Sequence, residues 1–205
     1  MSSAKSLTGG TGDVNPQWTV FNLTLTGPGG GVTNSVESAL STGAGRVPLG
    51  TSKNNKAVVM EILKVQCLSQ FTLIAPDNLF RSFAAFVVLG TRSLSGVAVG
   101  IFSYSTANTV DEHRITGAQQ LAGAAGAFQT FGGDSTLFVH DLTDGAGHGV
   151  LVASQNLYAT LAISNGANAM LVPATDQYIQ LRVLYRYKEV SLPEYLGIAQ
   201  GQLSV

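Results

Sequence analysis

The chain has 205 residues and a formal net charge of −1, from 11 Lys and Arg against 12 Asp and Glu. Only 11% of its residues are charged, about half the share in an average soluble domain, and so neutral a surface predicts that copies of the chain associate. This near-zero net charge excludes strong electrostatic capture of nucleic acid by the molecule as a whole. The longest apolar stretch, around 83–89, is far too short to span a membrane.

In chain order, the sequence begins with an expected arm and a first strand. Residues 1–16 lack the basic-then-apolar character of a secretory signal, so we expect the protein to be made inside a cell. Residues 18–26 alternate with period two, which predicts a strand with its phenylalanine and two leucines on one face. Residues 56–66 are apolar on both faces apart from Glu61 and flanking lysines, which predicts a central strand covered on both sides.

Glycine-rich turns separate a series of strand candidates in the middle of the chain. The 24 glycines cluster largely between these candidates, where they permit positive φ in tight turns and disfavour helices. Segment 117–133 is open between a small-residue helix, which its alanines favour, and a long loop, which its glycines favour. The strand candidates cover residues 68–75, 80–90, 97–104, 109–116, 135–142, 149–153 and 155–164.

The last strand, residues 176–189, has the clearest alternation in the chain. One face carries aliphatic residues followed by two tyrosines, and the other face carries two arginines and a lysine among polar residues. Residues 191–205 predict a C-terminal arm, in which 193–196 form one helical turn.

Together these elements predict an all-β fold: a single antiparallel β-sandwich of jelly-roll type with glycine-rich loops and extended terminal arms. The sandwich would occupy residues 17–190, between arms at 1–16 and 191–205. An immunoglobulin-like sandwich is the alternative, although the chain lacks the Cys…Trp…Cys spacing of that fold. Cys67 is the only cysteine, and its apolar neighbours in the sequence predict a buried, inert thiol.

The polar residues offer little catalytic chemistry. The densest cluster, 140–148, contains two histidines and two aspartates, but their spacing matches neither a zinc site nor a calcium loop. We interpret it as a strand that ends at Leu142, followed by an Asp-Gly turn; a cation held between subunits by Asp141 or Asp144 is the alternative. Residues 111–114 are typical of a solvated strand end. We therefore expect a protein that is not an enzyme, with no catalytic residue, no metal and no cofactor.

Six basic residues are candidates for contact with nucleic acid. Three lie on one face of the last strand and three lie just before or at the start of the strand at 56–66, so they could meet phosphates along a positive surface. The competing interpretation is an ordinary solvent-facing strand edge, or salt bridges to neighbouring subunits. The candidates are Arg46, Lys53, Lys56, Arg182, Arg186 and Lys188.

Three stretches of the chain resemble a known family. The opening SLTGGTGDVNPQ, the run NKAVVMEILKVQ and the closing QYIQLRVLYRYKEVSLPEYLG are similar to small capsid proteins of circular single-stranded DNA viruses that encode a replication initiator. The resemblance implies a jelly-roll subunit that self-assembles into an icosahedral shell of about sixty copies. It also implies that the protein is a component of the virion and encloses a single-stranded DNA genome.

The N-terminal arm departs from the usual pattern of that family, which is rich in Arg and Lys. The first 45 residues hold one cation, Lys5, against Asp13 and Glu37. We therefore expect at most a weak contact between the inner surface and single-stranded DNA, and no contact with membranes. The alternative function is an oligomeric jelly-roll binding module, either a trimer or a carbohydrate binder, although Trp18 is the only tryptophan.

Overall fold

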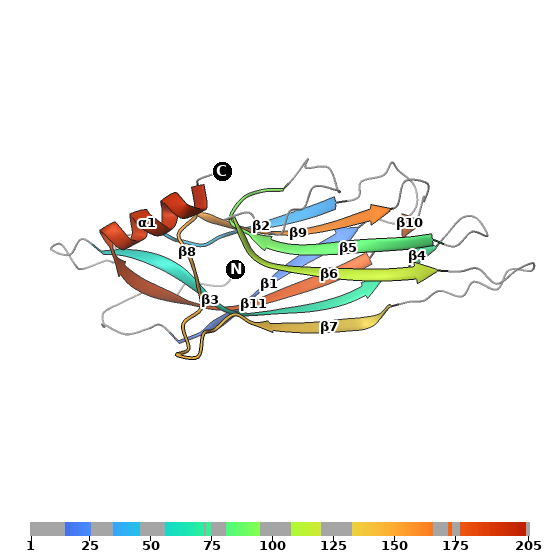
Figure 1. Cartoon of the computed structure of the whole chain (residues 1–205), viewed down its shortest axis with the longest axis horizontal. Helices are drawn as coiled ribbons and strands as arrows, with labels where there is room; N and C mark the ends of the chain where they lie inside the picture. Colours follow the sequence, from blue (N-terminus) through green and yellow to red (C-terminus); the bar gives the residue numbers. More distant parts are fainter. Residues whose placement is uncertain are drawn as a thin grey trace, which may run out of the picture.

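The computed structural model describes residues 15–25, 35–45, 56–71, 73–74, 81–94, 108–119, 133–165, 172–173 and 177–203. These residues form eleven strands and one helix (Figure 1). The strands are β1 (Gln17–Leu25), β2 (Ser35–Ser41), β3 (Lys56–Phe71), β4 (Leu73–Ile74), β5 (Arg81–Gly90), β6 (Thr109–Gln119), β7 (Gly133–Asp141), β8 (Val150–Val152), β9 (Asn156–Asn165), β10 (Val172–Pro173) and β11 (Gln177–Ser191). The helix is α1 (Leu192–Leu203).

Most strand candidates are confirmed, with ends shifted by a few residues. β3 continues past the expected break, so that 56–66 and the first half of the 68–75 candidate form one strand of 16 residues, and 73–74 form β4. β2 was not expected, because its Ser and Ala residues have little strand preference, but it pairs with β9 along its whole length. The candidate at 97–104 lies outside the described residues. Of the segment at 117–133, open between a helix and a loop, residues 117–119 end β6, Gly133 begins β7, and 120–132 lie outside the described residues.

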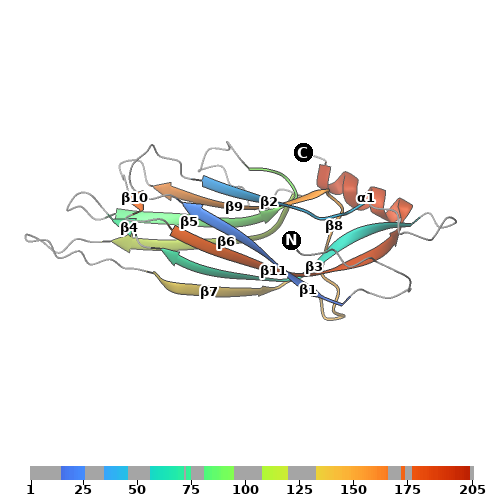
Figure 2. The ribbon, with the colours of Figure 1, turned by 180° about the vertical axis from the view of Figure 1, so that it is seen from behind.

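The strands form two antiparallel sheets that pack face to face (Figure 1 and Figure 2). Sheet A has the order β1-β11-β3-β7, with β8 also pairing with β3. Sheet B has the order β2-β9-β5-β6, and β4 and β10 pair separately. Every pair in both sheets is antiparallel, which confirms the predicted all-β sandwich.

Nested strand pairing makes this sandwich a jelly roll. β1 pairs with β11, β2 with β9, β3 with β7 and β5 with β6, so each pair lies inside the previous one along the chain. Such nesting is what results when one long hairpin is rolled up into two four-stranded sheets. The immunoglobulin-like alternative is wrong, because its sheets are not built from nested pairs.

The core lies between the two sheets and is built from alternate residues of each strand. On β1, Phe21 and Leu23 are buried, as the alternation predicts. On β11, the aliphatic residues of the expected apolar face are buried, and Tyr185 and Tyr187 pack against the same cluster. β3 lies between β11 and β7 and is buried on both faces along its first half, which confirms the prediction of a central, doubly covered strand.

The register between β3 and β11 shifts by one residue, and the change from β7 to β8 as the second partner of β3 occurs at the same place. Leu184 pairs with Lys64 and Tyr185 pairs with Ile62, so Leu63 has no partner in β11. On the other side of β3, β7 pairs with the residues after the shift and β8 with those before it. The loop of residues 142–149, which connects β7 to β8, is anchored here by the Leu142 amide, which donates to the Leu63 carbonyl at 2.9 Å.

The C-terminal segment is more helical than the single turn expected at 193–196. Glu194 donates its backbone amide to the Ser191 hydroxyl at 3.3 Å, so Ser191 caps the first turn of α1. The helix packs Tyr195, Ile198 and Ala199 on a second apolar cluster, formed by Ala57, Val59, Ala153 and Val190. Within the residues described above, no helix has the length and apolar character that a membrane crossing requires.

Candidate functional site: the outer face of sheet A

The six basic candidates occupy different environments. Arg46 and Lys53 lie outside the described residues. Lys56 forms a salt bridge with Glu189 at 3.2 Å, in which both side chains are partly exposed. Arg182 is exposed, and its guanidinium carbon lies 4.9 Å from the centre of the Trp18 ring. The basic residues on β11 are therefore not one continuous positive surface.

Arg186 and Lys188 belong to a charged cluster around the buried carboxylate of Glu61. Glu61 has no solvent exposure, and the Arg186 guanidinium donates a hydrogen bond directly to it. The Lys188 ammonium lies 4.0 Å from the same carboxylate, and the Gly149 amide donates to it at 3.0 Å. Burial alone would raise the pKa of Glu61, but these hydrogen bonds and positive charges outweigh it and lower that pKa.

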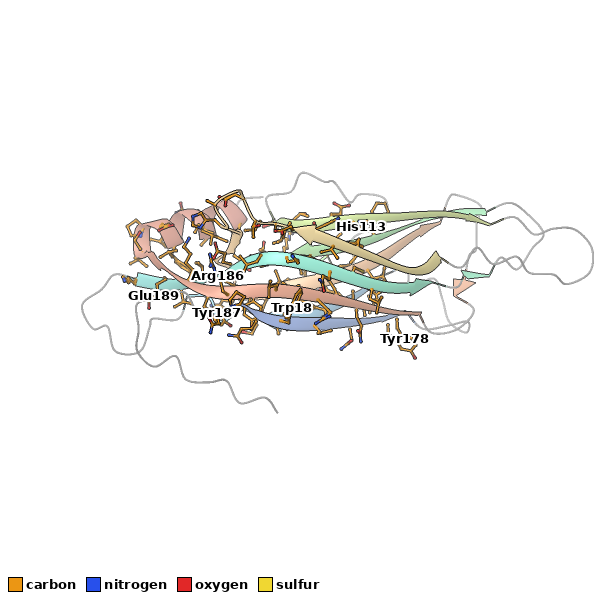
Figure 3. The ribbon with its side chains drawn as sticks, turned by 90° about the horizontal axis from the view of Figure 1, so that it is seen from below. Trp18, His113, Tyr178, Arg186, Tyr187 and Glu189 are labelled. Carbon is orange, nitrogen blue, oxygen red and sulfur yellow. The ribbon has the colours of Figure 1, made fainter. Side chains whose placement is uncertain are left out.

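This cluster accounts for much of the charge on the basic face of β11. At Arg182, β11 lies between β1 and β3, so the interpretation as a strand edge is wrong there. At Arg186 and Lys188, beyond the end of the pairing with β1, β11 pairs with β3 alone. The salt bridge of Arg186 is made within the chain, to the neighbouring strand, and Figure 3 labels Arg186 on β11 beside β3. Contact of any of the six candidates with nucleic acid remains a prediction.

The polar cluster at 140–148 forms the predicted turn. β7 ends at Asp141, and the Asp144 side chain accepts the amides of Ala146 at 2.9 Å and His148 at 2.8 Å. Gly147 has a φ of 83°, a conformation that favours glycine. In the part of the chain that the structure describes, no group of three or more His, Cys, Asp or Glu is placed to hold a metal ion.

A histidine cluster at the junction of the two sheets was not expected from the sequence. Asp111 on β6 lies 2.9 and 3.0 Å, through its two carboxylate oxygens, from Nδ1 of His140 on β7. His113 stacks on Phe138 with ring centres 3.6 Å apart, and its ring lies 5.3 Å from that of His140. Burial and the nearby His140 lower the pKa of His113, while Asp111 opposes this shift. The interpretation of 111–114 as a solvated strand end therefore does not hold for Asp111 and His113, which pack against β7.

Sheet A presents an outer face with few charges. Because alternate residues of a strand point to opposite sides, the residues next to the buried ones on β1, β3, β7 and β11 point outward. One row across the sheet runs from Val20 through Arg182 and Gln66 to Val139. Five large hydrophobic side chains on this face are 41 to 61% exposed: Trp18, Val20, Leu68, Val139 and Tyr178. Figure 3 looks from the side of sheet A and labels Trp18 and Tyr178.

Comparison with known proteins adds structural likenesses at low sequence identity. No protein-family model and no curated protein matches the chain. The human polyomavirus 6 VP1 pentamer is similar at 12% identity and a TM-score of 0.43, over 86% of this chain and 95% of that one. The human polyomavirus 7 VP1 pentamer has 10% identity and a TM-score of 0.44, over 86% and 96%. Merkel cell polyomavirus VP1, in complex with disialyllactose, has 10% identity and a TM-score of 0.41, over 91% and 100%. The assignment of the jelly-roll fold rests on the strand pairing of this chain alone.

Proposed function

We propose that this chain is the structural subunit of a viral capsid, which self-assembles into a closed icosahedral shell. Support comes from one observation above all: a jelly-roll sandwich leaves a broad sheet face exposed that carries five large hydrophobic residues and few charges. A soluble monomer rarely presents such a face, because exposed apolar patches of this kind promote association. The role is structural, and no step of it requires catalysis.

The family resemblance supplies the finer part of the proposal. A shell of about sixty copies is the smallest closed icosahedral arrangement, and the genome inside it would be single-stranded DNA. Among the four described candidates, Arg182 is the most exposed and is the one that can meet a phosphate without leaving a carboxylate partner. The first 45 residues contribute only Lys5, so the protein would hold DNA weakly.

Negative-stain electron microscopy of the purified full-length chain tests the proposal. Closed particles of uniform diameter are the expected result. A monodisperse trimer or a monomer at high concentration would contradict it, and a trimer would favour the alternative of an oligomeric binding module.

Nuclease-protected DNA recovered from purified particles tests the genome contact separately. An Arg182→Gln variant is expected to form particles with less protected DNA, whereas the matched Lys56→Gln variant keeps the wild-type amount, because Lys56 is held by Glu189. Equal DNA content in both variants would remove Arg182 from the genome contact.

A further inference from the structure

The two sheets differ in how their outer faces are covered. Glu37, Thr160, Val88 and Glu112 form a row across the outer face of sheet B. Thr160 is 2% exposed and Val88 is 3% exposed. The chain following β5 lies over this row, since the Glu37 carboxylate accepts hydrogen bonds from both Ser93 and the Leu94 amide at 2.7 Å. On sheet A, α1 and the loop of residues 142–149 cover one end of the outer face, over Val59, Glu61 and Val190. Among the described residues, no segment covers the rows from Lys64 and Leu184 onward in this way.

The few charges on the outer face of sheet A are largely satisfied within that face. The Lys64 ammonium lies 3.7 Å from the Asp141 carboxylate, and Arg182 lies over the Trp18 ring. In the open rows of this face the net charge is close to +1, from Lys64 and Arg182 against Asp141. At the covered end of the same face, Arg186 and Lys188 surround the Glu61 carboxylate and add a net charge of about +1. Two copies of such a face can meet without strong repulsion, whereas tight binding of nucleic acid requires many more cations.

The composition of this face is that of a protein interface. Aromatic residues and Arg are enriched at the centres of such interfaces, and Lys and Glu are depleted. Here Trp18, Tyr178 and Arg182 stand among aliphatic and neutral polar neighbours. A sheet face of this kind can pack against another sheet at about 10 Å, in the same way as the two layers of a sandwich.

The size of the face suits a modest contact between two copies. Four strands spaced about 4.8 Å apart, each about nine residues long, cover about 600 Å² per copy. Two copies would bury about 1,200 Å², the lower limit for a specific interface. Contacts of this size are individually weak, and a closed shell becomes stable because each subunit makes several of them.

We propose that the outer face of sheet A is a docking surface for a second copy of this chain. The inference rests on the proposed self-assembly and assigns it to named residues at the centre of the contact, Val20, Leu68 and Val139. Arg182 lies in the row between Val20 and Val139, so a second copy docked here covers it, and this docking surface and a DNA contact through Arg182 exclude each other. Equal DNA content in Arg182→Gln and Lys56→Gln particles is the result that the docking surface predicts. Burial of these side chains against the second copy removes apolar surface from water, and that burial drives the contact.

Light scattering of the full chain at increasing concentration tests the surface with a Val20→Glu variant and a Leu196→Glu control. Val20 is 46% exposed on the face and Leu196 is 49% exposed on α1, so the two changes add the same charge at equally exposed sites. The Val20 variant is expected to need at least about tenfold more protein for half-maximal assembly, because its carboxylate would be buried in the contact. The Leu196 control should assemble as the wild type does. Thermal unfolding of each variant confirms that it is folded.

Crosslinking supplies a second readout that does not depend on an added charge. Cys67 is the only cysteine and is fully buried, so Val139→Cys introduces one reactive thiol on the face. A bis-maleimide should link Val139→Cys copies into dimers during assembly, and should link Leu196→Cys copies much more slowly. Equal crosslinking of the two variants would overturn the assignment.

The outcomes separate the docking surface from the proposed function. Wild-type chain that never assembles would defeat the capsid proposal itself. Normal assembly of Val20→Glu without Val139→Cys crosslinks would leave the capsid proposal standing and overturn only the docking surface. Loss of bound oligodeoxythymidine in Val20→Glu, with normal assembly, would instead assign the face to nucleic acid.

Discussion

At the scale of single residues, the carboxylate of Glu61 is fully buried and therefore depends on hydrogen bonds and positive charges inside the protein. It lies 125 residues from Arg186 in sequence and hydrogen-bonds to it across two adjacent strands. An Arg186→Met variant would leave this charge buried without its main partner, so it is expected to lower the free energy of unfolding by about 3–5 kcal/mol. Urea denaturation measures the loss.

The matched control for that variant is Lys56→Met, which breaks the partly exposed pair with Glu189. Exposed ion pairs contribute little because water screens them, so this change is expected to cost less than about 1 kcal/mol. Equal losses in the two variants would show that the burial of Glu61 has no energetic consequence.

His113 makes the stability of the fold depend on pH. Burial and the neighbouring His140 lower its pKa in the folded state, so the unfolded chain takes up its proton first as pH falls through about 6.5. Stability should therefore decrease from pH 6.5 down to the folded pKa. A His113→Phe variant keeps a ring beside Phe138 and should lose less stability over that window, as measured by thermal unfolding against pH.

Glu112 titrates in the opposite sense, since burial and Asp111 raise its pKa. Its contribution is present in both proteins, so the difference between the wild-type and His113→Phe curves isolates the histidine. Parallel curves between neutral pH and pH 5 would contradict the role given to His113.

At the scale of elements, the connection from β7 to β8 is closed at Gly149. A Cβ at this position would lie 2.1 Å from the Ile62 carbonyl oxygen, a backbone atom that cannot move aside. Gly149→Ala is therefore expected to lower the free energy of unfolding by about 1–3 kcal/mol. It should also make the amide of residue 149 exchange its hydrogen faster, because that amide donates to the Glu61 carboxylate.

Gly145→Ala in the same loop is the control. A Cβ there would meet no atom within 4 Å, so this variant should unfold like the wild type in denaturant titrations. A loss of stability as large as that of Gly149→Ala would mean that the loop is sensitive to any side chain, rather than to the close approach at Ile62.

At the scale of the whole molecule, assembly should depend only weakly on salt. Few charged pairs are available to be screened, and burial of apolar surface is not weakened by sodium chloride. Particles measured by light scattering between about 0.1 and 1 M sodium chloride should keep the same assembly concentration within a few-fold. Dissociation caused by high salt at neutral pH would contradict the picture of a low-charge contact.

The amino-acid sequence by itself determined most of the segments that are strands, β2 excepted, and which of their residues face the core. Alternation with period two is a local property, so Phe21 and Leu23 on β1 and the aliphatic residues of β11 could be placed from the pattern alone. A local signal for α1 was present too: Ser191 and Glu194 stand three residues apart, as in a capping box.

Only the tertiary structure decided which strands pair, and therefore which charged side chains form ion pairs within the chain. Glu61 and Arg186 meet because β3 lies beside β11, and His113 meets His140 because β6 and β7 lie at the same side of the sandwich. The sequence placed the cations of β11 on one face. In the structure Arg186 and Lys188 surround the Glu61 carboxylate at one end of that face, whereas Arg182 is exposed at the other. Contacts between segments far apart in the chain are set by how the two sheets pack, and no local pattern encodes them.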